Sequence, residues 1–186
     1  NGFPSFYPKA KDISLIALFS AIIVICSLIT IPSAIPFTLQ TFAIFLAICI
    51  LGGKKTTIIV FVYLLMGCIG IPVFSGFCGG IGCLVGNTGG FLIGFLFSTV
   101  AIWGIERLTE IRPWIQWLQM ITCICICYLF GVLWYLHIIQ IRLSFQTIIP
   151  IVSVYVVPYI IPDIVKMCVA YIVSKRLKKV IRNISR

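Results

Sequence analysis

Two charged residues lie inside an otherwise apolar stretch near the C-terminal end of this 186-residue chain. Asp163 and Lys166 are three positions apart, a spacing that puts both side chains on one face of a helix. A charged side chain at membrane depth costs at least ~2.5–3.5 kcal/mol, so such residues are usually paired and functional. We interpret the two residues as a ligand-binding pair that faces the interior of a helix bundle. The alternatives are a purely structural ion pair, or a lysine that extends toward the basic C-terminal tail.

The composition around this pair is that of an integral membrane protein. Hydrophobic residues make up 61% of the chain and charged residues 10%, whereas soluble domains are about 45–50% apolar and 25% charged. Charge-free stretches cover residues 13–53, 56–105, 113–141 and 143–162. A membrane-spanning helix needs about 20 apolar residues, and the two longest stretches are interrupted by prolines at 31–36 and by a glycine-rich segment at 71–88.

We therefore predict an all-α, polytopic membrane protein, with a single transmembrane domain over 1–186 and a short basic tail at 175–186. The six predicted transmembrane helices lie at about 13–31, 37–52, 56–71, 89–105, 114–136 and 147–174. The second of them is short, which predicts either tilting or shielding by neighbouring helices. Because no small-residue cleavage site follows the first apolar run, we expect that run to remain as the first helix.

The formal net charge of +10 is explained by topology. Of the 14 Lys and Arg residues, all but Arg142 and Lys166 fall on one side of the predicted membrane. Cytoplasmic loops carry the excess of Lys and Arg, so both termini are predicted to be cytoplasmic, next to anionic membrane lipid. This placement argues against nucleic acid as a partner.

The segment between the third and fourth spans is too long and too apolar for a plain linker. Irregular backbone near a bilayer is tolerated where it is buried in protein or lines a cavity, so we expect a lid or pocket wall. Phe74 and Phe77 would supply apolar contacts to a ligand. Thr88 is the expected N-cap of the fourth span, and a helix N-terminus favours an anion. The residues expected near a ligand carboxylate are Asn87, Thr88, Gly89 and Gly90.

The remaining reactive residue types form no recognisable catalytic or metal-binding pattern. Cys123, Cys125 and Cys127 alternate along one helix, so only the first and last share a face, and we predict no metal site. Cys78 and Cys83 lie on the translocated side, where a disulfide can form; the sequence leaves this open. An intramembrane enzyme that uses a cysteine or His137 is disfavoured because no Cys–His–acid set can be placed on facing helices. The segment 52–56 lacks the spacing of a phosphate-binding loop, so we predict no ATP site.

Four short motifs, in this order and at this spacing, resemble the BioY family: Ile35–Thr41, Gly70–Phe74, Asn87–Gly90 followed by Gly94-Phe95, and Pro162-Asp163 with Lys166. BioY proteins are the biotin-binding S components of energy-coupling factor (ECF) transporters, and the resemblance runs from about residue 13 to 179. One departure is Asn87, where the family pattern usually has proline.

The resemblance implies the six-helix S-component fold in a bacterial cytoplasmic membrane, with biotin as ligand and no cofactor. It further implies that an Ala-xxx-Ala surface on the first helix, matched by Ala17 and Ala21, docks onto a transmembrane coupling subunit. Two ATPase subunits would then supply the energy that this chain cannot. A solitary ion-coupled or facilitative vitamin carrier, or an S component for another vitamin, stays open as an alternative.

Biotin offers two ureido N–H donors, one ureido carbonyl, an apolar thiophane ring and a carboxylate. An ionised Asp163 only accepts hydrogen bonds, so we place it on the ureido N–H side. Lys166 would serve the ureido carbonyl or the carboxylate, and we favour the carbonyl. Gln40 would contact the ring or order the lid. Tyr159, which shares a helical face with Tyr155 and Asp163, is either a pocket wall or a membrane-interface aromatic.

Overall fold

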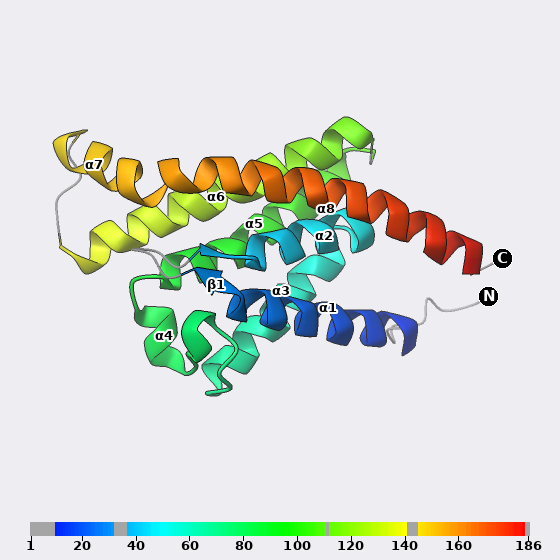
Figure 1. Cartoon of the computed structure of the whole chain (residues 1–186), viewed down its shortest axis with the longest axis horizontal. Coiled ribbons are helices and arrows are strands. Elements are labelled where there is room, and N and C mark those ends of the chain that lie inside the picture. The colour runs from blue at the N-terminus through cyan, green and yellow to red at the C-terminus, as the bar shows by residue number, and fades with distance from the viewer. Residues whose placement is uncertain (1–9, 32–36, 111, 141–144, 185–186) are drawn as a thin grey trace.

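The computed structural model describes residues 10–31, 37–110, 112–140 and 145–184. The principal helices are α1 (Ala10–Leu28), α2 (Gln40–Leu51), α3 (Gly53–Cys68), α5 (Gly89–Leu108), α6 (Pro113–Ile138), α7 (Phe145–Tyr155) and α8 (Val157–Ile184). A 3-10 turn, η1 (Ser75–Phe77), and the short helix α4 (Ile81–Val85) lie between α3 and α5. Helix α1 begins and α8 ends at one end of the molecule, while α4 and α7 lie at the other end (Figure 1).

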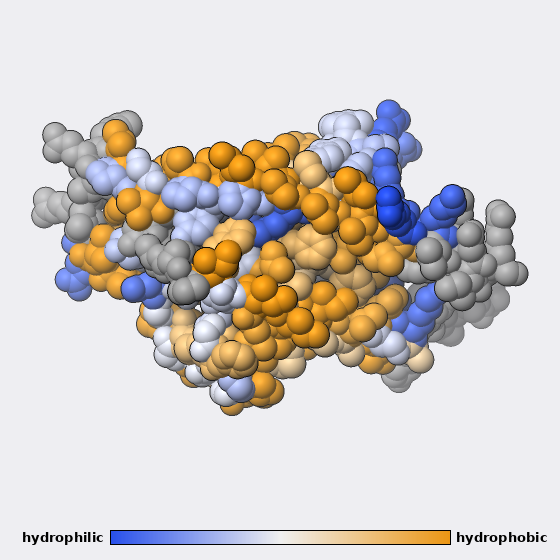
Figure 2. Space-filling model, in the orientation of Figure 1, coloured by the Kyte–Doolittle hydropathy of each residue, from blue (hydrophilic) through white to orange (hydrophobic). Residues whose placement is uncertain are grey.

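Four helices among the described residues are long and apolar enough to cross a membrane: α1, α5, α6 and residues 157–179 of α8. Helix α2 is apolar but has 12 residues, and α3 has 16. Hydrophobic residues cover most of the middle of the face seen in Figure 2, around one hydrophilic patch, and further hydrophilic residues gather toward its ends. This distribution is that of a mostly helical protein with its middle in the bilayer.

Helix α2 is buried on every side, which explains how so short a helix can lie within the bundle. Residues 43–49 are all buried without interruption, and the helix contacts α1, α3, α6 and α8. A helix that is hydrophobic all round belongs in the interior of a bundle. Shielding by its neighbours therefore accommodates the short second span.

The predicted spans need two corrections. The last, 147–174, consists of α7 and α8, which are separated at Val156; Pro158 occupies the first turn of α8, where the missing N–H has no helical partner. The first two spans each lose one end to a two-stranded ribbon, β1 (Thr30–Ile31) paired antiparallel with β2 (Phe37–Thr38), so the chain is not purely α-helical. Of the predicted proline break at 31–36, residues 32–36 lie outside the described residues, as does the outer cation Arg142.

The turn between α2 and α3 consists of Gly52 alone, in a conformation (φ 80°, ψ 170°) that favours glycine. A carboxylate from α5 fixes this turn. The Glu106 Oε2 atom accepts a hydrogen bond from the Gly53 backbone N–H at 2.6 Å, and its Oε1 atom accepts one from Gln119 Nε2 at 3.1 Å. Because an anion is stabilised at a helix N-terminus, Glu106 holds α3, α5 and α6 together at this end.

Candidate functional site

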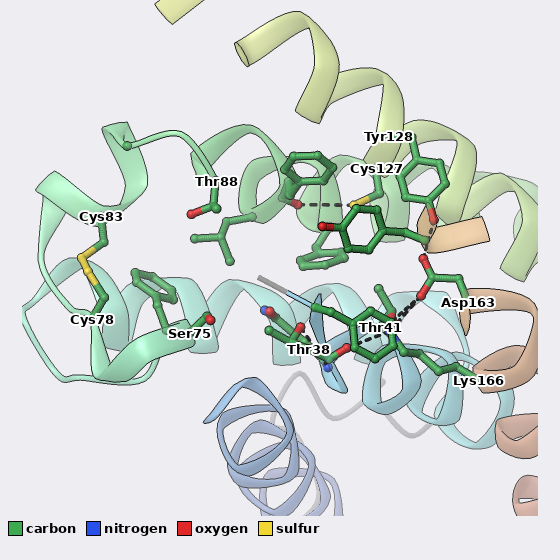
Figure 3. Close-up of a pocket in the computed structure, with 18 of the residues that line it drawn as sticks. Thr38, Thr41, Ser75, Cys78, Cys83, Thr88, Cys127, Tyr128, Asp163 and Lys166 are labelled. Carbon is green, nitrogen blue, oxygen red and sulfur yellow. Dashed lines mark hydrogen bonds and ion pairs between the residues drawn. A yellow bond between two sulfur atoms is a disulfide. The ribbon is translucent and has the colours of Figure 1, made fainter. Parts of the chain in front are cut away.

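A cavity of about 440 Å³ lies between β2, α2, α5, α6, α8 and the segment that carries η1 and α4. This volume is within the roughly 300–1,000 Å³ typical of small-molecule sites. One wall is apolar, with Phe91, Leu92 and Phe95 of α5 facing Phe37 and Tyr159. Polar side chains, among them Thr41, Tyr128, Asp163 and Lys166, gather at one end of the cavity (Figure 3).

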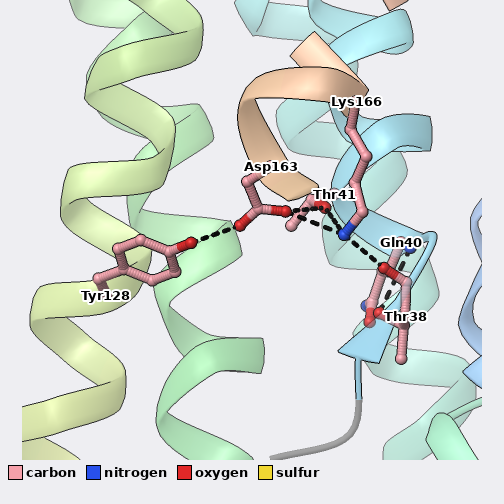
Figure 4. Close-up of polar contacts among 6 residues, drawn as sticks. All are labelled: Thr38, Gln40, Thr41, Tyr128, Asp163 and Lys166. Carbon is pink, nitrogen blue, oxygen red and sulfur yellow. Dashed lines mark hydrogen bonds and ion pairs between the residues drawn. The ribbon is translucent and has the colours of Figure 1, made fainter. Parts of the chain in front are cut away.

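Lys166 is fully engaged by the protein. Its Nζ atom lies 2.9 Å from Asp163 Oδ1 and donates to the Thr38 carbonyl at 2.7 Å and to Thr41 Oγ1 at 3.0 Å (Figure 4). The lysine and aspartate side chains are only 7% and 5% exposed. Since an ammonium has three protons, all the donors of Lys166 are used, and they join α8 to β2 and to the start of α2.

Asp163 accepts hydrogen bonds from three side chains. Besides Lys166, Thr41 Oγ1 donates to its Oδ1 atom at 3.1 Å, and Tyr128 Oη donates to its Oδ2 atom. The carboxylate therefore ties together α2, α6 and α8. A carboxylate has about four acceptor positions, so Asp163 retains capacity for one further donor.

Aromatic rings close one side of this charge pair. Lys166 Nζ lies 3.9 Å from the centroid of the Phe37 ring, and Phe37 stacks on Tyr159 with centroids 6.3 Å apart. A cation over an aromatic face is attracted by the ring quadrupole. The ribbon residue Phe37 is thereby held against α8 at the edge of the cavity.

Gln40 contributes a buried polar group with unused hydrogen-bonding capacity. It lines the cavity and is 4% exposed. Within the described residues its Nε2 atom has no hydrogen-bond partner. Buried polar groups are nearly always satisfied, so an unsatisfied amide beside a cavity points to a ligand acceptor.

The segment between α3 and α5 forms the wall opposite the charge pair, and its first end is firmly anchored. The Val73 carbonyl accepts hydrogen bonds from Tyr63 Oη at 3.2 Å and from Ser27 Oγ. The Phe74 ring meets Tyr63 edge-on, with centroids 5.5 Å apart, and occupies the space above Gly67. Phe74 thus reaches the cavity from a fixed position.

The second end of the segment is held by α6, and its middle carries a disulfide. Trp134 Nε1 donates to the Gly86 carbonyl at 3.0 Å. Between the two anchors, Cys78 and Cys83 are joined by a disulfide bond, and both residues line the cavity (Figure 3). The possibility left open by the sequence is thereby settled in favour of the bond.

Six of the ten predicted ligand-binding residues line the cavity: Gln40, Phe74, Thr88, Tyr159, Asp163 and Lys166. The side chain of Tyr155 lies outside the described residues.

The other four do not line it. Asn87 is exposed, and so is Phe77, whose exposed fraction is 70%. Gly89 and Gly90 are buried, but they pack against the Leu84 carbonyl and Trp134 rather than facing the cavity. Thr88 is the N-cap residue of α5, as predicted, although its side chain makes no cap hydrogen bond.

Thr38, Thr41 and Tyr128 are site residues that the sequence did not reveal. Thr38 and Thr41 fall within the Ile35–Thr41 motif, and that was the available signal for them. Tyr128 had none, since it is one of several aromatic residues in an apolar helix and reaches Asp163 from 35 positions away.

No group of His, Cys, Asp and Glu that could hold a metal ion occurs in the described part of the chain. Cys123 and Cys127 are buried on one face of α6 and Cys125 is exposed, as their spacing predicts. On α1, Ala17 and Ala21 are both exposed, one turn apart on the outer face of the bundle.

Comparison with known proteins agrees with this architecture. A model of the BioY family matches residues 4–183. The "Probable biotin transporter BioY" of Pyrococcus horikoshii is 35% identical over 171 residues, which are 91% of this chain and 98% of that protein. The "Biotin transporter BioY" of Thermotoga maritima is 37% identical over 166 residues, 87% of this chain and 92% of that protein.

A solved structure is similar over the same extent. The crystal structure of the S-component for biotin from an ECF-type ABC transporter superposes with a TM-score of 0.73 and 27% sequence identity, covering 92% of both chains. Sequence and fold therefore agree over nearly the whole length, and the chain belongs to the BioY family.

Proposed function

We propose that the protein is the biotin-binding S component of an ECF transporter, which captures biotin and imports it together with a coupling protein and two ATPases. The observation that carries this proposal is the buried Asp163–Lys166 pair at the polar end of a cavity of small-molecule size. Membership of the BioY family and likeness to a biotin S-component structure support the choice of ligand.

The ureido ring is best accommodated at the polar end. Asp163 has one acceptor position left after its bonds to Thr41, Tyr128 and Lys166, and a ureido N–H would fill it. Lys166 has no donor to spare, so its role is to balance the charge of Asp163 and to hold its carboxylate in place. The Nε2 atom of Gln40 is then the group best suited to donate to the ureido carbonyl.

The valeryl carboxylate would lie toward the segment between α3 and α5. Thr88 and Ser75 line this part of the cavity and each offers a hydroxyl donor. Between the two polar ends, Phe91 and Phe95 provide an apolar wall for the thiophane ring and the methylenes. Of the residues first expected near the carboxylate, Thr88 is the one that we retain.

We infer six membrane crossings within a single transmembrane domain, made by α1, α2, α3, α5, α6 and the α7–α8 pair. Helices α2 and α3 are short, but α2 is enclosed by other helices and needs no lipid contact of its own. Lys54, Lys55, Arg107 and the basic end of α8 fall at the end where α1 begins. That end is cytoplasmic by the positive-inside rule, and α4, which belongs to the segment that lines the cavity, lies at the other end (Figure 1).

The outer face of α1 is the proposed docking surface for the coupling protein. Ala17 and Ala21 leave a shallow strip on this face, where another helix can approach closely. Leu18 and Ile25 on the same helix are also exposed and extend the apolar contact. Replacing Ala17 and Ala21 by Leu should abolish copurification of the coupling protein and leave biotin binding unchanged. Loss of biotin binding in this variant would contradict the assignment of α1 to docking.

The binding function is tested by isothermal titration of the detergent-purified protein with biotin. We expect one biotin per chain, and a large loss of affinity in Asp163→Asn and in Lys166→Ala, since removing one partner leaves the other charge buried and unpaired. Asp12→Asn is the control, because Asp12 pairs with Lys55 on the surface. It should bind as the wild type does.

The outcomes separate site from function. Unchanged affinity in both pair variants would refute the site while leaving the function. Absence of binding by the wild type would refute the function, and tight binding of a different vitamin would identify an S component for that vitamin.

A further inference from the structure

The wall of the cavity opposite the charge pair has little regular structure to hold its shape. Between Cys68 and Gly89 the chain forms only the three-residue turn η1 and the five-residue helix α4. Gly70, Gly76 and Gly80 adopt positive φ, which makes this stretch a series of tight turns rather than a rigid element. Six of its residues line the cavity beyond Phe74: Ser75, Cys78, Gly82, Cys83, Gly86 and Thr88.

Apolar burial holds the middle of this wall only in part, since Cys78, Cys83 and Leu84 pack against the core while partly buried. Neither η1 nor α4 contains a buried residue, and the large side chains of Phe77, Ile81 and Val85 are mostly exposed. The firm anchors lie at the two ends, at Val73 and at Gly86. Segments with few buried contacts are those that open most readily.

The middle of this wall is cross-linked internally by a covalent bond. The Cys78–Cys83 disulfide connects the end of η1 to α4 across five positions. Two backbone hydrogen bonds lie beside it. Phe74 N–H donates to the Cys78 carbonyl at 2.9 Å, and Gly80 N–H donates to the Gly67 carbonyl at 2.7 Å, which ties the middle to α3 at one point. Both cysteines line the cavity, so the bond itself is part of the wall that a ligand would meet.

We propose that the Cys78–Cys83 disulfide is a clasp for the outer wall of the cavity, and that the affinity for substrate depends on the clasp being closed. The inference rests on the proposed function. The bond lies at the end of the molecule opposite the basic residues, in the loop assigned to the outside of the membrane. Disulfides persist in such an oxidising environment, and an extracellular thiol reductant would weaken substrate capture.

Opening the clasp is an ordinary thiol–disulfide exchange. Dithiothreitol supplies two electrons and two protons: the Cys78–Cys83 S–S bond breaks, each sulfur becomes a thiol, and the reagent is oxidised to its cyclic disulfide. The free segment then visits conformations in which the wall is displaced. Because apparent affinity falls by the fraction of molecules in the competent conformation, a wall that is formed one-tenth of the time raises the biotin Kd about tenfold.

The experiment measures the biotin Kd of the detergent-purified protein before and after treatment with dithiothreitol, with thiols followed by mass spectrometry. Protein prepared without reductant should contain the disulfide and seven free cysteines: Cys26, Cys49, Cys68, Cys123, Cys125, Cys127 and Cys168. We expect reduction to weaken binding roughly tenfold and reoxidation to restore it.

Two variants complete the test. Cys78→Ser/Cys83→Ser should bind about as weakly as the reduced wild type and should not respond to dithiothreitol. Cys125→Ser removes an exposed cysteine of α6 that does not line the cavity, and it should behave as the wild type in both states. The comparison of oxidised with reduced wild type stands by itself if the double variant does not fold.

The outcomes distinguish the clasp from the function. Equal Kd values in the oxidised and reduced wild type would overturn the clasp while leaving a biotin-binding protein. Free thiols at Cys78 and Cys83 in protein prepared without reductant would overturn it as well. A wild type that binds no biotin in either state would instead overturn the proposed function on which the clasp depends.

Discussion

Gly67→Ala should disrupt the binding site although Gly67 does not line the cavity. Gly67 lies near the end of α3, and a Cβ atom added there would fall 1.9 Å from Cζ of Phe74 and within 2.5 Å of two further ring atoms. No such contact is possible, so the ring must leave its position. Phe74 is buried, lines the cavity and begins the wall between α3 and α5.

The magnitude follows from what the displaced ring loses. Forcing an extra carbon into a packed interior costs about 1–3 kcal/mol, and the edge-on pairing of Phe74 with Tyr63 is worth about 0.5–1.5 kcal/mol. Replacing glycine by alanine within a helix recovers at most about 1 kcal/mol, and less near a helix end. The net expectation is a destabilisation of about 1–3 kcal/mol. If this free energy falls entirely on the closed form of the wall, biotin affinity drops by about 5- to 150-fold.

The assay is thermal unfolding in detergent together with biotin titration, and Gly104→Ala is the matched control. Gly104 also lies in a helix, α5, but nothing comes within 4 Å of a Cβ atom placed there. The control should therefore be neutral or slightly stabilising and should bind biotin normally.

If Gly67→Ala and Gly104→Ala have the same melting temperature and the same biotin Kd, the reasoning is refuted. That result would mean that Phe74 can move without consequence, and that the wall does not depend on its first anchor.

Two further perturbations test the polar interactions. Glu106→Gln should lower the melting temperature and reduce the free energy of unfolding by about 1–3 kcal/mol. The reason is that an amide N–H₂ group would replace an oxygen that accepts a hydrogen bond from Gly53 or from Gln119. The biotin Kd of this variant, measured by titration, should stay at the wild-type value since Glu106 does not line the cavity. In a double-mutant cycle followed by thermal unfolding, Asp163→Asn and Lys166→Met should each destabilise by about 3–5 kcal/mol, and the double variant by less than the sum; strict additivity would show that the pair is not coupled.

The positions of the helices could be predicted largely from charge and hydropathy, because lipid imposes these patterns on the sequence. The junction at Val156 was missed although Pro158 marks it, since the surrounding stretch carries no charge and is apolar enough to be read as one span. The ribbon β1–β2 was missed because strands of two residues are too short for any periodicity to register.

For the site, the sequence identified the residues whose type is unusual for their surroundings. Asp163 and Lys166 stand out as charges in an apolar segment, and their spacing already predicts that they face one another. Tyr128 and Thr41 are ordinary residues of apolar helices, and only packing brings them to Asp163. Asn87 was expected near the ligand but does not line the cavity. The sequence of a loop that adjoins a pocket does not reveal which of its side chains turn inward.

The enclosure of α2 has a consequence for how the protein senses its surroundings. Thr41 sits on a helix with no face toward lipid, whereas its partners Asp163 and Lys166 sit on α8, whose Ile161, Val165 and neighbouring residues are exposed to it. The polar network also includes Tyr128 of α6, a helix with exposed apolar residues of its own. It therefore joins one helix shielded from lipid to two helices that are subject to the thickness and tension of the bilayer. Biotin affinity is expected to vary with acyl-chain length in nanodiscs, which makes the lipid an effector of substrate capture rather than an inert solvent.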